Sequence, residues 1–129
     1  MAAAGPRREG EPPVSEAVAE RLADTMFALS TPSRVRILAC LLGGPRSVTD
    51  LTGALGMEQS AVSHQLRVLR EHDLVRAAKD GRKRLYALSD EHVSTLLHAA
   101  FDHVGVSHPA RRAPRPPRAL PGEAAQGGP

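Results

Sequence analysis

The sequence predicts a mainly α-helical domain that carries one β-hairpin near its C-terminal end. Apolar residues recur at helical spacing through most of residues 15–108. The segment "LVRAAKDGRKRLYALS" instead shows two short β-type runs joined at Asp80-Gly81, which is a strong hairpin signal. Residues 1–14 and 109–129 are rich in Pro and Gly and lack apolar periodicity, so both tails are predicted to be disordered.

Two helices are predicted before the first glycine-rich break, "GGP". The first covers Ser15–Leu29, with Ser15 as its N-cap. The second starts near Pro32, which suits a first helical turn, and ends at about Leu42. The apolar positions are Val18, Leu22, Met26 and Leu29 in the first helix, and Val35, Ile37, Leu38 and Leu41 in the second.

Two further helices are predicted on either side of a tight turn at Gly56. Ser47 and Asp50 form a variant of the capping box at the start of the third helix, which turns Leu51 and Leu55 inward. The fourth helix begins at about Glu58 and directs three residues inward: Val62, Leu66 and Leu69. After the hairpin, a last helix begins at Asp90.

Composition sets limits on the class of protein. The chain has 129 residues and only 2% aromatic residues, so a single thin core is expected, and oligomerisation would complete the burial of apolar surface. The single cysteine, Cys40, excludes an intrachain disulfide and is expected to be a buried, inert thiol. Neither a signal peptide nor a membrane span is recognisable, which predicts a cytoplasmic protein without membrane contacts.

The net charge of +3 belongs to the C-terminal tail, because residues 15–108 hold 11 basic and 11 acidic residues. Charge alone is therefore weak support for nucleic-acid binding. The Arg/Pro-rich tail is compatible with non-specific phosphate contacts and with a solvated segment. Local clustering is more informative, since "KDGRKR" at 79–84 holds four basic groups and one acid.

Two short helices around a glycine turn, followed by a basic hairpin, indicate a winged helix-turn-helix. In this fold the second helix enters the major groove of DNA. Its outward side chains, which would read bases and hold phosphates, are Gln59, Ser60, Ser63, His64 and Arg67. The wing would lie along phosphates through Lys79, Arg82, Lys83 and Arg84. The alternative is a solvated amphipathic helix and a solvated basic turn, but the order of helices, hairpin and basic wing favours DNA binding.

The segments "TPSRVRILACLLGGPRSVTDLTGALGMEQSAVSHQLRVLREHDLV" and "GRKRLYALSDEHV" resemble the ArsR/SmtB family of bacterial winged-helix repressors. The similarity covers about residues 18–108, and "QSAVSHQLRVLR" is its most specific part. The resemblance implies a homodimer, built on the first and last helices, that binds double-stranded operator DNA and is usually released by a metal ion. It also implies that the outward residues of the fourth helix and the basic hairpin form the DNA-binding surface.

The family's thiol-based effector site is not predicted, because the matching stretch "RSVTDL" contains no cysteine. The last helix instead carries His92 and His103, eleven residues apart on one face but separated by roughly 16 Å. One ion cannot bridge them within one helix. Antiparallel pairing of two copies brings His92 of one protomer to His103 of the other. The expected apolar seam is Val93, Leu96, Leu97, Ala100 and Val104.

The resemblance implies a last-helix site made of an Asp-x-His pair from one subunit and a His, with a further His or Glu three residues on, from the other. Asp90, His92 and His103 match three of these four positions, whereas the fourth is Val106, which cannot coordinate a metal. His108 is the nearest replacement, and water is the alternative. Asp90 also suits an N-cap, and the two roles can coexist. Nitrogen and oxygen ligands without a thiolate fit Ni(II), Zn(II) or Co(II).

Two functions remain open from the sequence. The first is a metal-responsive transcription regulator, by family default a repressor, although the sequence does not fix the sign of the metal effect. The second is a constitutive DNA-binding regulator with a degenerate metal site, which senses through a partner protein or not at all. An enzyme is not predicted, because no activated nucleophile or phosphate loop is present. His98 is expected to face solvent, and His72 to favour the end of the fourth helix.

Overall fold

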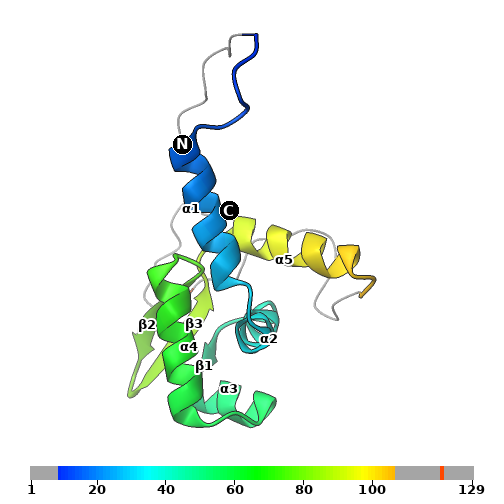
Figure 1. The fold of residues 1–129 in the computed structure, drawn as a ribbon. Helices are drawn as coiled ribbons and strands as arrows, with labels where there is room; N and C mark the ends of the chain where they lie inside the picture. The colour runs from blue at the N-terminus through cyan, green and yellow to red at the C-terminus, as the bar shows by residue number, and fades with distance from the viewer. Residues whose placement is uncertain (1–8, 107–119, 121–129) are drawn as a thin grey trace, which may run out of the picture.

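The computed structural model describes residues 9–106 and residue 120. Figure 1 shows their arrangement, with a small sheet on one side of α4 and α1 rising beyond α2, α3 and α4. The predictions for residues 1–8, 107–119 and 121–129, including His108 and nearly all of the Arg/Pro-rich tail, lie outside the described residues. The elements are α1 (Glu16–Ala28), α2 (Pro32–Leu41), β1 (Arg46–Ser47), α3 (Val48–Leu55), α4 (Gln59–Glu71), β2 (Val75–Asp80), β3 (Lys83–Leu88) and α5 (Glu91–His103).

Side-chain caps fix the starts of the first three helices, as the sequence predicts for two of them. The Ser15 side chain accepts a hydrogen bond of 3.2 Å from the backbone N–H of Val18. Thr31 caps α2 in the same way, directly before Pro32. At α3 both halves of the capping box between Ser47 and Asp50 are present, each at 3.0 Å. These caps satisfy backbone donors that a helix start leaves without a partner.

The hydrophobic core is built by residues of α2, α3, α4, β2, β3 and α5, and α1 adds Ala28. Its largest fully buried side chains come from α2, α3, α4 and β3. Among them are the three residues that the sequence places on the inner face of α4. The complete set is Ile37, Leu38, Leu51, Val62, Leu66, Leu69 and Leu88.

The sheet has one strand more than the predicted hairpin. Its order is β1-β3-β2, and both pairs are antiparallel. In β1, Arg46 pairs with Tyr86 and Ser47 pairs with Leu85. A strand of two residues is too short for an alternating pattern, so sequence periodicity could not have revealed it. It joins the start of α3 to the middle of the hairpin and so fixes the wing against the helices.

Leu120, in the tail predicted to be disordered, is the one described residue beyond 106, and its side chain is buried. At the other end, residues 9–14 form neither helix nor strand and are exposed. Within the described part of the chain, no helix combines the length and apolar character needed to cross a membrane.

Candidate nucleic-acid interface and metal-ligating residues

The turn before α4 presents the start of this helix to solvent. Gly56 ends α3 in the left-handed region at φ 64°, where a residue without a Cβ is favoured. Glu58 is the N-cap of α4, and its side chain makes no capping hydrogen bond. All five residues predicted to face DNA are exposed: Gln59, Ser60, Ser63, His64 and Arg67. The opposite face is the buried one, so α4 separates the core cleanly from an outward polar surface.

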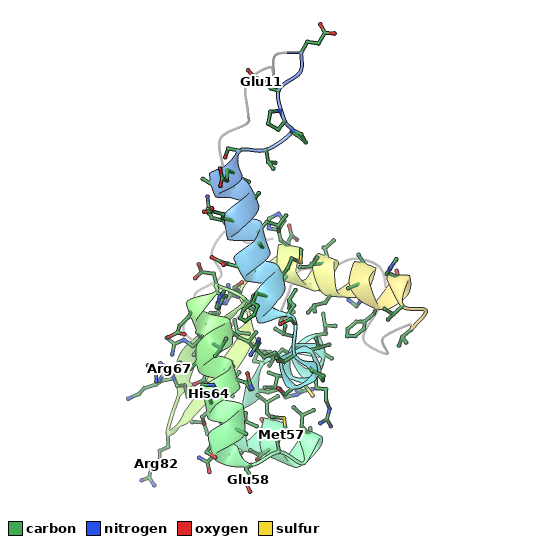
Figure 2. The ribbon with its side chains drawn as sticks, in the orientation of Figure 1. Glu11, Met57, Glu58, His64, Arg67 and Arg82 are labelled. Carbon is green, nitrogen blue, oxygen red and sulfur yellow. The ribbon has the colours of Figure 1, made fainter. Side chains whose placement is uncertain are left out.

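The wing is a tight hairpin with four exposed cations. Asp80 pairs with Lys83, so the turn consists of Gly81 and Arg82, one residue later than the predicted Asp80-Gly81 junction. Gly81 has φ 64°, which a two-residue hairpin turn requires at its first position. Figure 2 shows Arg82 at the hairpin tip and Arg67 on α4 pointing to the same side of the molecule. The exposed cations are Lys79, Arg82, Lys83 and Arg84.

The wing cations are placed where they repel one another. Lys79 and Arg84 are direct cross-strand partners, so two like charges stand opposite each other on one face of the hairpin. Such a pair destabilises an isolated hairpin. An anionic partner on the same face would offset the repulsion, which favours a surface built for phosphates.

Asp50 links this basic surface to the start of α3. The backbone N–H and hydroxyl of Ser47 lower the pKa of the Asp50 carboxyl, and the charges of Lys83 and Arg46 lower it further. The carboxylate is therefore held in its charged form by the capping box and by the wing. Its negative charge at a helix N-terminus is also favourable toward the helix dipole.

Two elements expose apolar side chains that the protomer itself does not cover. In α1, Val18, Leu22 and Met26 follow one another at four-residue spacing and are all exposed; Leu22 is 55% exposed. Phe27, beside them, is 69% exposed. Val104, directly after α5, is exposed as well. An uncovered apolar stripe of this length is typical of an interface.

The predicted seam of α5 needs correction. Val93 and Leu97 are buried in the core of their own protomer, where α5 packs on β3. They are therefore not available to a second copy. Leu96 is half-buried, and Ala100 and Val104 are exposed, so these three remain candidates for a dimer contact. Helical spacing places Val93, Leu97, Ala100 and Val104 on one stripe but does not show which part of that stripe the domain itself covers.

Asp90 and His92 lie together at the start of α5. Asp90 is the N-cap, and its Oδ1 accepts hydrogen bonds from the backbone N–H groups of His92 (2.9 Å) and Val93 (3.2 Å). The Nδ1 atom of His92 lies 3.6 Å from the same oxygen. The His92 side chain is 90% exposed and that of Asp90 57%. The cap hydrogen bonds both end on Oδ1, so the cap does not use Oδ2, and both side chains face outward.

His103 stands at the other end of α5 and is exposed. The helix then ends in an ordered turn: Gly105 has φ 81° and donates to Asp102 O, and Val106 donates to Phe101 O at 2.9 Å. This is a Schellman motif, which closes the C-terminal end of α5. Val106 is exposed and offers no ligand atom. His108 lies outside the described residues.

Within the part of the chain that the structure describes, no three His, Cys, Asp or Glu side chains come close enough to hold a metal ion. Asp90 and His92 are brought together, whereas His103 lies at the opposite end of the same helix.

Three further residues with predicted environments are His98, Cys40 and His72. His98 is half-buried and its Nδ1 is inaccessible to solvent, so the prediction that it faces solvent is wrong. Cys40 is half-buried and packs against the core. His72 is the C-cap of α4, and its Nδ1 donates to Val68 O at 2.9 Å, as its predicted place at the helix end suggests.

Sequence reasoning missed a buried arginine that contacts the inner edge of α4. Arg34 of α2 is 7% exposed. Its Nη1 donates to the Oε1 of Gln65 at 3.0 Å, and its other donors reach the last carbonyls of α1. One feature of the sequence could have indicated it: Arg34 is a cation in the first turn of a helix, a position that the helix dipole disfavours.

The geometry agrees with comparisons to known proteins. The family model for "Bacterial regulatory protein, arsR family" matches residues 31–77, which hold α2, α3 and α4. The regulator NmtR of Mycobacterium tuberculosis, a helix-turn-helix transcriptional regulator, is 48% identical over 111 residues, covering 81% of this chain and 92% of that protein. The chain belongs to the ArsR family.

Further similarities support the membership. A transcriptional repressor SmtB homolog of Synechocystis is 41% identical over 86 residues, covering 67% of this chain and 65% of that protein. The solution structure of a homodimeric winged helix-turn-helix DNA-binding domain from Mycobacterium bovis, a possible ArsR-family regulator, has a TM-score of 0.64 at 29% identity. It covers 75% of this chain and 89% of that one. The ArsR-family chain described here is therefore a winged helix-turn-helix transcriptional regulator.

Proposed function

We propose that this ArsR-family regulator is a homodimeric repressor whose operator affinity is controlled by Ni(II), Zn(II) or Co(II) bound between its last helices. The observation that carries the proposal is the pairing of two exposed ligand-type side chains, Asp90 and His92, at one end of α5, with an exposed His103 at the other. The polar face of α4 and the basic wing would hold double-stranded DNA.

The DNA-binding part rests on the division of α4 into two faces. The inner face is fully buried, so the helix has one fixed rotation and presents Ser60, Ser63 and Arg67 outward. Short hydroxyl and amide side chains near the start of a recognition helix suit base edges, and an arginine suits phosphate or guanine. The wing adds Arg82 on the same side as Arg67 (Figure 2).

The homodimer is supported by the uncovered apolar stripe of α1. Val18, Leu22 and Met26 would remain in water in a single protomer, at a cost of about 25 cal/mol for each Å² of apolar surface. A small core with few aromatic residues gives little surplus stability to offset that exposure. Pairing through α1 and the outer face of α5 would cover the stripe, and a winged-helix relative is described as homodimeric.

The residues present fit a divalent transition metal in part. An imidazole and a carboxylate lie next to each other, and a second imidazole is exposed at the far end of the helix. A metal held by Asp90 and His92 of one protomer and His103 of its partner would cross-link the two last helices as a Lewis acid with nitrogen and oxygen ligands. The chain itself contributes the antiparallel pairing of α5, the Asp90 cap that fixes the helix start, and the exposure that admits an ion.

A second candidate is a constitutive regulator with a degenerate metal site, and Val106 favours it. This residue occupies the position where the family pattern places the fourth ligand, and its side chain is exposed without a coordinating atom. Three protein ligands bind a metal less tightly than four of the same kind. The switch would then operate through a partner protein or be lost.

Operator binding with and without metal distinguishes the two functions. A duplex selected by the full-length protein from a random pool serves as the operator, and its affinity is measured by fluorescence anisotropy with no metal and with each of Ni(II), Zn(II) and Co(II). The proposal predicts that at least one ion changes operator affinity by about fivefold or more. Equal affinity in all four conditions would support the constitutive regulator instead.

A further inference from the structure

Arg34 is a buried cation at an unusual place. It lies in the first turn of α2, where the partial positive charge of the helix N-terminus opposes it. Its side chain is 7% exposed, and Arg34 and Ser47 are the two polar residues in the buried core of the described chain. A buried guanidinium is tolerated only when its donors are satisfied, so its partners explain why it is there.

The first set of partners is the C-terminal end of α1. Arg34 Nε donates to the carbonyl of Ala28, and Nη2 donates to the carbonyl of Phe27 at 3.2 Å. The last turn of α1 contains no basic residue of its own. Arg34 therefore supplies the positive charge that the end of this helix lacks, and it fixes where α1 leaves the domain.

The second partner is on the recognition helix. Arg34 Nη1 donates to Oε1 of Gln65 at 3.0 Å. Gln65 lies between the exposed His64 and the buried Leu66, at the edge where the outer face of α4 meets the core. One rigid guanidinium thus joins the element that carries the uncovered apolar stripe to the element that faces DNA.

We propose that Arg34 is a positioning residue that fixes the orientation of the recognition helix α4 relative to α1, and through α1 relative to the second protomer. This inference rests on the homodimer proposed above. Two recognition helices enter successive major grooves only when they sit about 34 Å apart. An arginine has a planar fork of donors that a lysine cannot reproduce, so the link requires arginine itself.

The direct readout is the tolerance of the protein for half-site spacing. Operator binding is compared on the duplex selected by the wild-type protein and on the same duplex with one base pair inserted between its half-sites. The wild-type protein should lose about tenfold or more in affinity on the longer duplex, because the dimer holds its recognition helices at one spacing. Metal ions are left out, so the result does not depend on the proposed metal response.

Arg34→Lys and Gln65→Met should each bind the selected duplex less tightly than the wild-type protein does. For each variant, the affinity for the longer duplex should be no more than about threefold below its affinity for the selected duplex. Their affinity for an unrelated duplex should stay within about twofold of wild type, because the phosphate contacts are unchanged. The double variant should be no weaker than either single variant, as expected for two groups that act through one hydrogen bond. Thermal unfolding and sedimentation verify that each variant is a folded dimer.

Arg36→Lys is the matched control. Arg36 lies on the same helix and donates to the Leu55 carbonyl of α3 at 3.1 Å, so it joins neither α1 nor α4. It should keep the wild-type spacing penalty. The inference is overturned if Arg34→Lys and Gln65→Met keep that penalty as well, or if their effects on operator affinity add. Sedimentation tests the proposed dimer separately: a monomeric wild-type protein would contradict the dimer. An unchanged spacing penalty in the variants contradicts only the role of Arg34.

Discussion

The Nδ1 atom of His92 lies 3.6 Å from Oδ1 of Asp90, at the first turn of α5, and both side chains face solvent. The same Oδ1 caps the helix through the backbone N–H groups of His92 and Val93. The cap orients the carboxylate beside the imidazole before any ion is present. A helix cap and a pair of ligand-type side chains therefore share one residue, and the third such side chain, His103, is one helix length away.

His92→Ala and His103→Ala should each lower Ni(II) or Co(II) affinity by more than about 100-fold at both symmetric sites of the dimer. Each proposed site uses one of these imidazoles from each protomer, so either change damages both sites. Isothermal titration checks this. His64→Ala is the control, because His64 is also exposed but lies on α4, and it should bind metal as the wild-type protein does. One remaining full-affinity site in either α5 variant would refute the shared geometry.

Leu22→Lys should dissociate the dimer. Leu22 lies in the middle of the uncovered stripe of α1, and loss of its burial costs about 2 kcal/mol in each protomer, which raises the dissociation constant of the dimer roughly a thousandfold. Sedimentation velocity over a range of concentrations measures it. Asp24→Lys places a lysine side chain about 200° around α1 from Leu22 and should leave the dimer intact. A dimer of unchanged affinity with Leu22→Lys would place the interface elsewhere.

Variants of the wing and of the recognition helix should affect DNA binding in different ways. Arg84→Ala should weaken binding to all DNA sequences and reduce the slope of log affinity against log salt by about 2 in a dimer, one for each lost phosphate contact. Gln59→Ala should instead relax base preference at one position in each half-site, by about 1–3 kcal/mol per half-site. Salt titrations and binding to single-base operator variants separate these effects. A wild-type salt slope in Arg84→Ala would show that this residue does not touch a phosphate.

Asp50 should make the stability of the domain sensitive to acid. Its pKa is lowered from 3.8 in the folded protein, first by hydrogen bonds from Ser47 and then by Lys83 and Arg46. A lowered folded pKa contributes stability above the unfolded value, and this stability is lost as the pH falls below 3.8 through the folded pKa. Asp50→Asn should therefore be less stable at neutral pH and show a flatter acid profile in urea unfolding. Asp24→Asn, outside the capping box, should keep the wild-type profile.

The sequence predicts helix bounds and buried residues well where a helix has a single apolar face. The fourth helix was predicted with its boundary and inner residues nearly correct, because Val62, Leu66 and Leu69 all face one core. The capping box at Ser47 and the left-handed turn at Gly56 depend on local chemistry and were also recognisable. Both kinds of signal act over a few residues and need no knowledge of the rest of the fold.

The same reasoning failed where burial depends on distant elements. Val93, Leu97, Ala100 and Val104 lie on one stripe of α5, yet Val93 and Leu97 are buried, whereas Ala100 and Val104, nearer the C-terminal end, are exposed. Periodicity does not show where along the helix the rest of the domain covers this stripe, and the half-buried state of His98 depends in the same way on the rest of the fold. Arg34 was missed, because its burial depends on where α1 ends and on a glutamine 31 residues away.

The central claim is that the two ends of α5 from different protomers form the site that controls operator affinity. The most direct test mixes His92→Ala and His103→Ala proteins, refolds them together and isolates the mixed dimer with two affinity tags. In this dimer one site keeps Asp90 and His92 of one chain and His103 of the other, and the second site has lost both imidazoles. The account predicts one metal ion per mixed dimer at wild-type affinity, a partial metal response in operator binding, and neither property in the two parent dimers. A mixed dimer that binds no metal would contradict it.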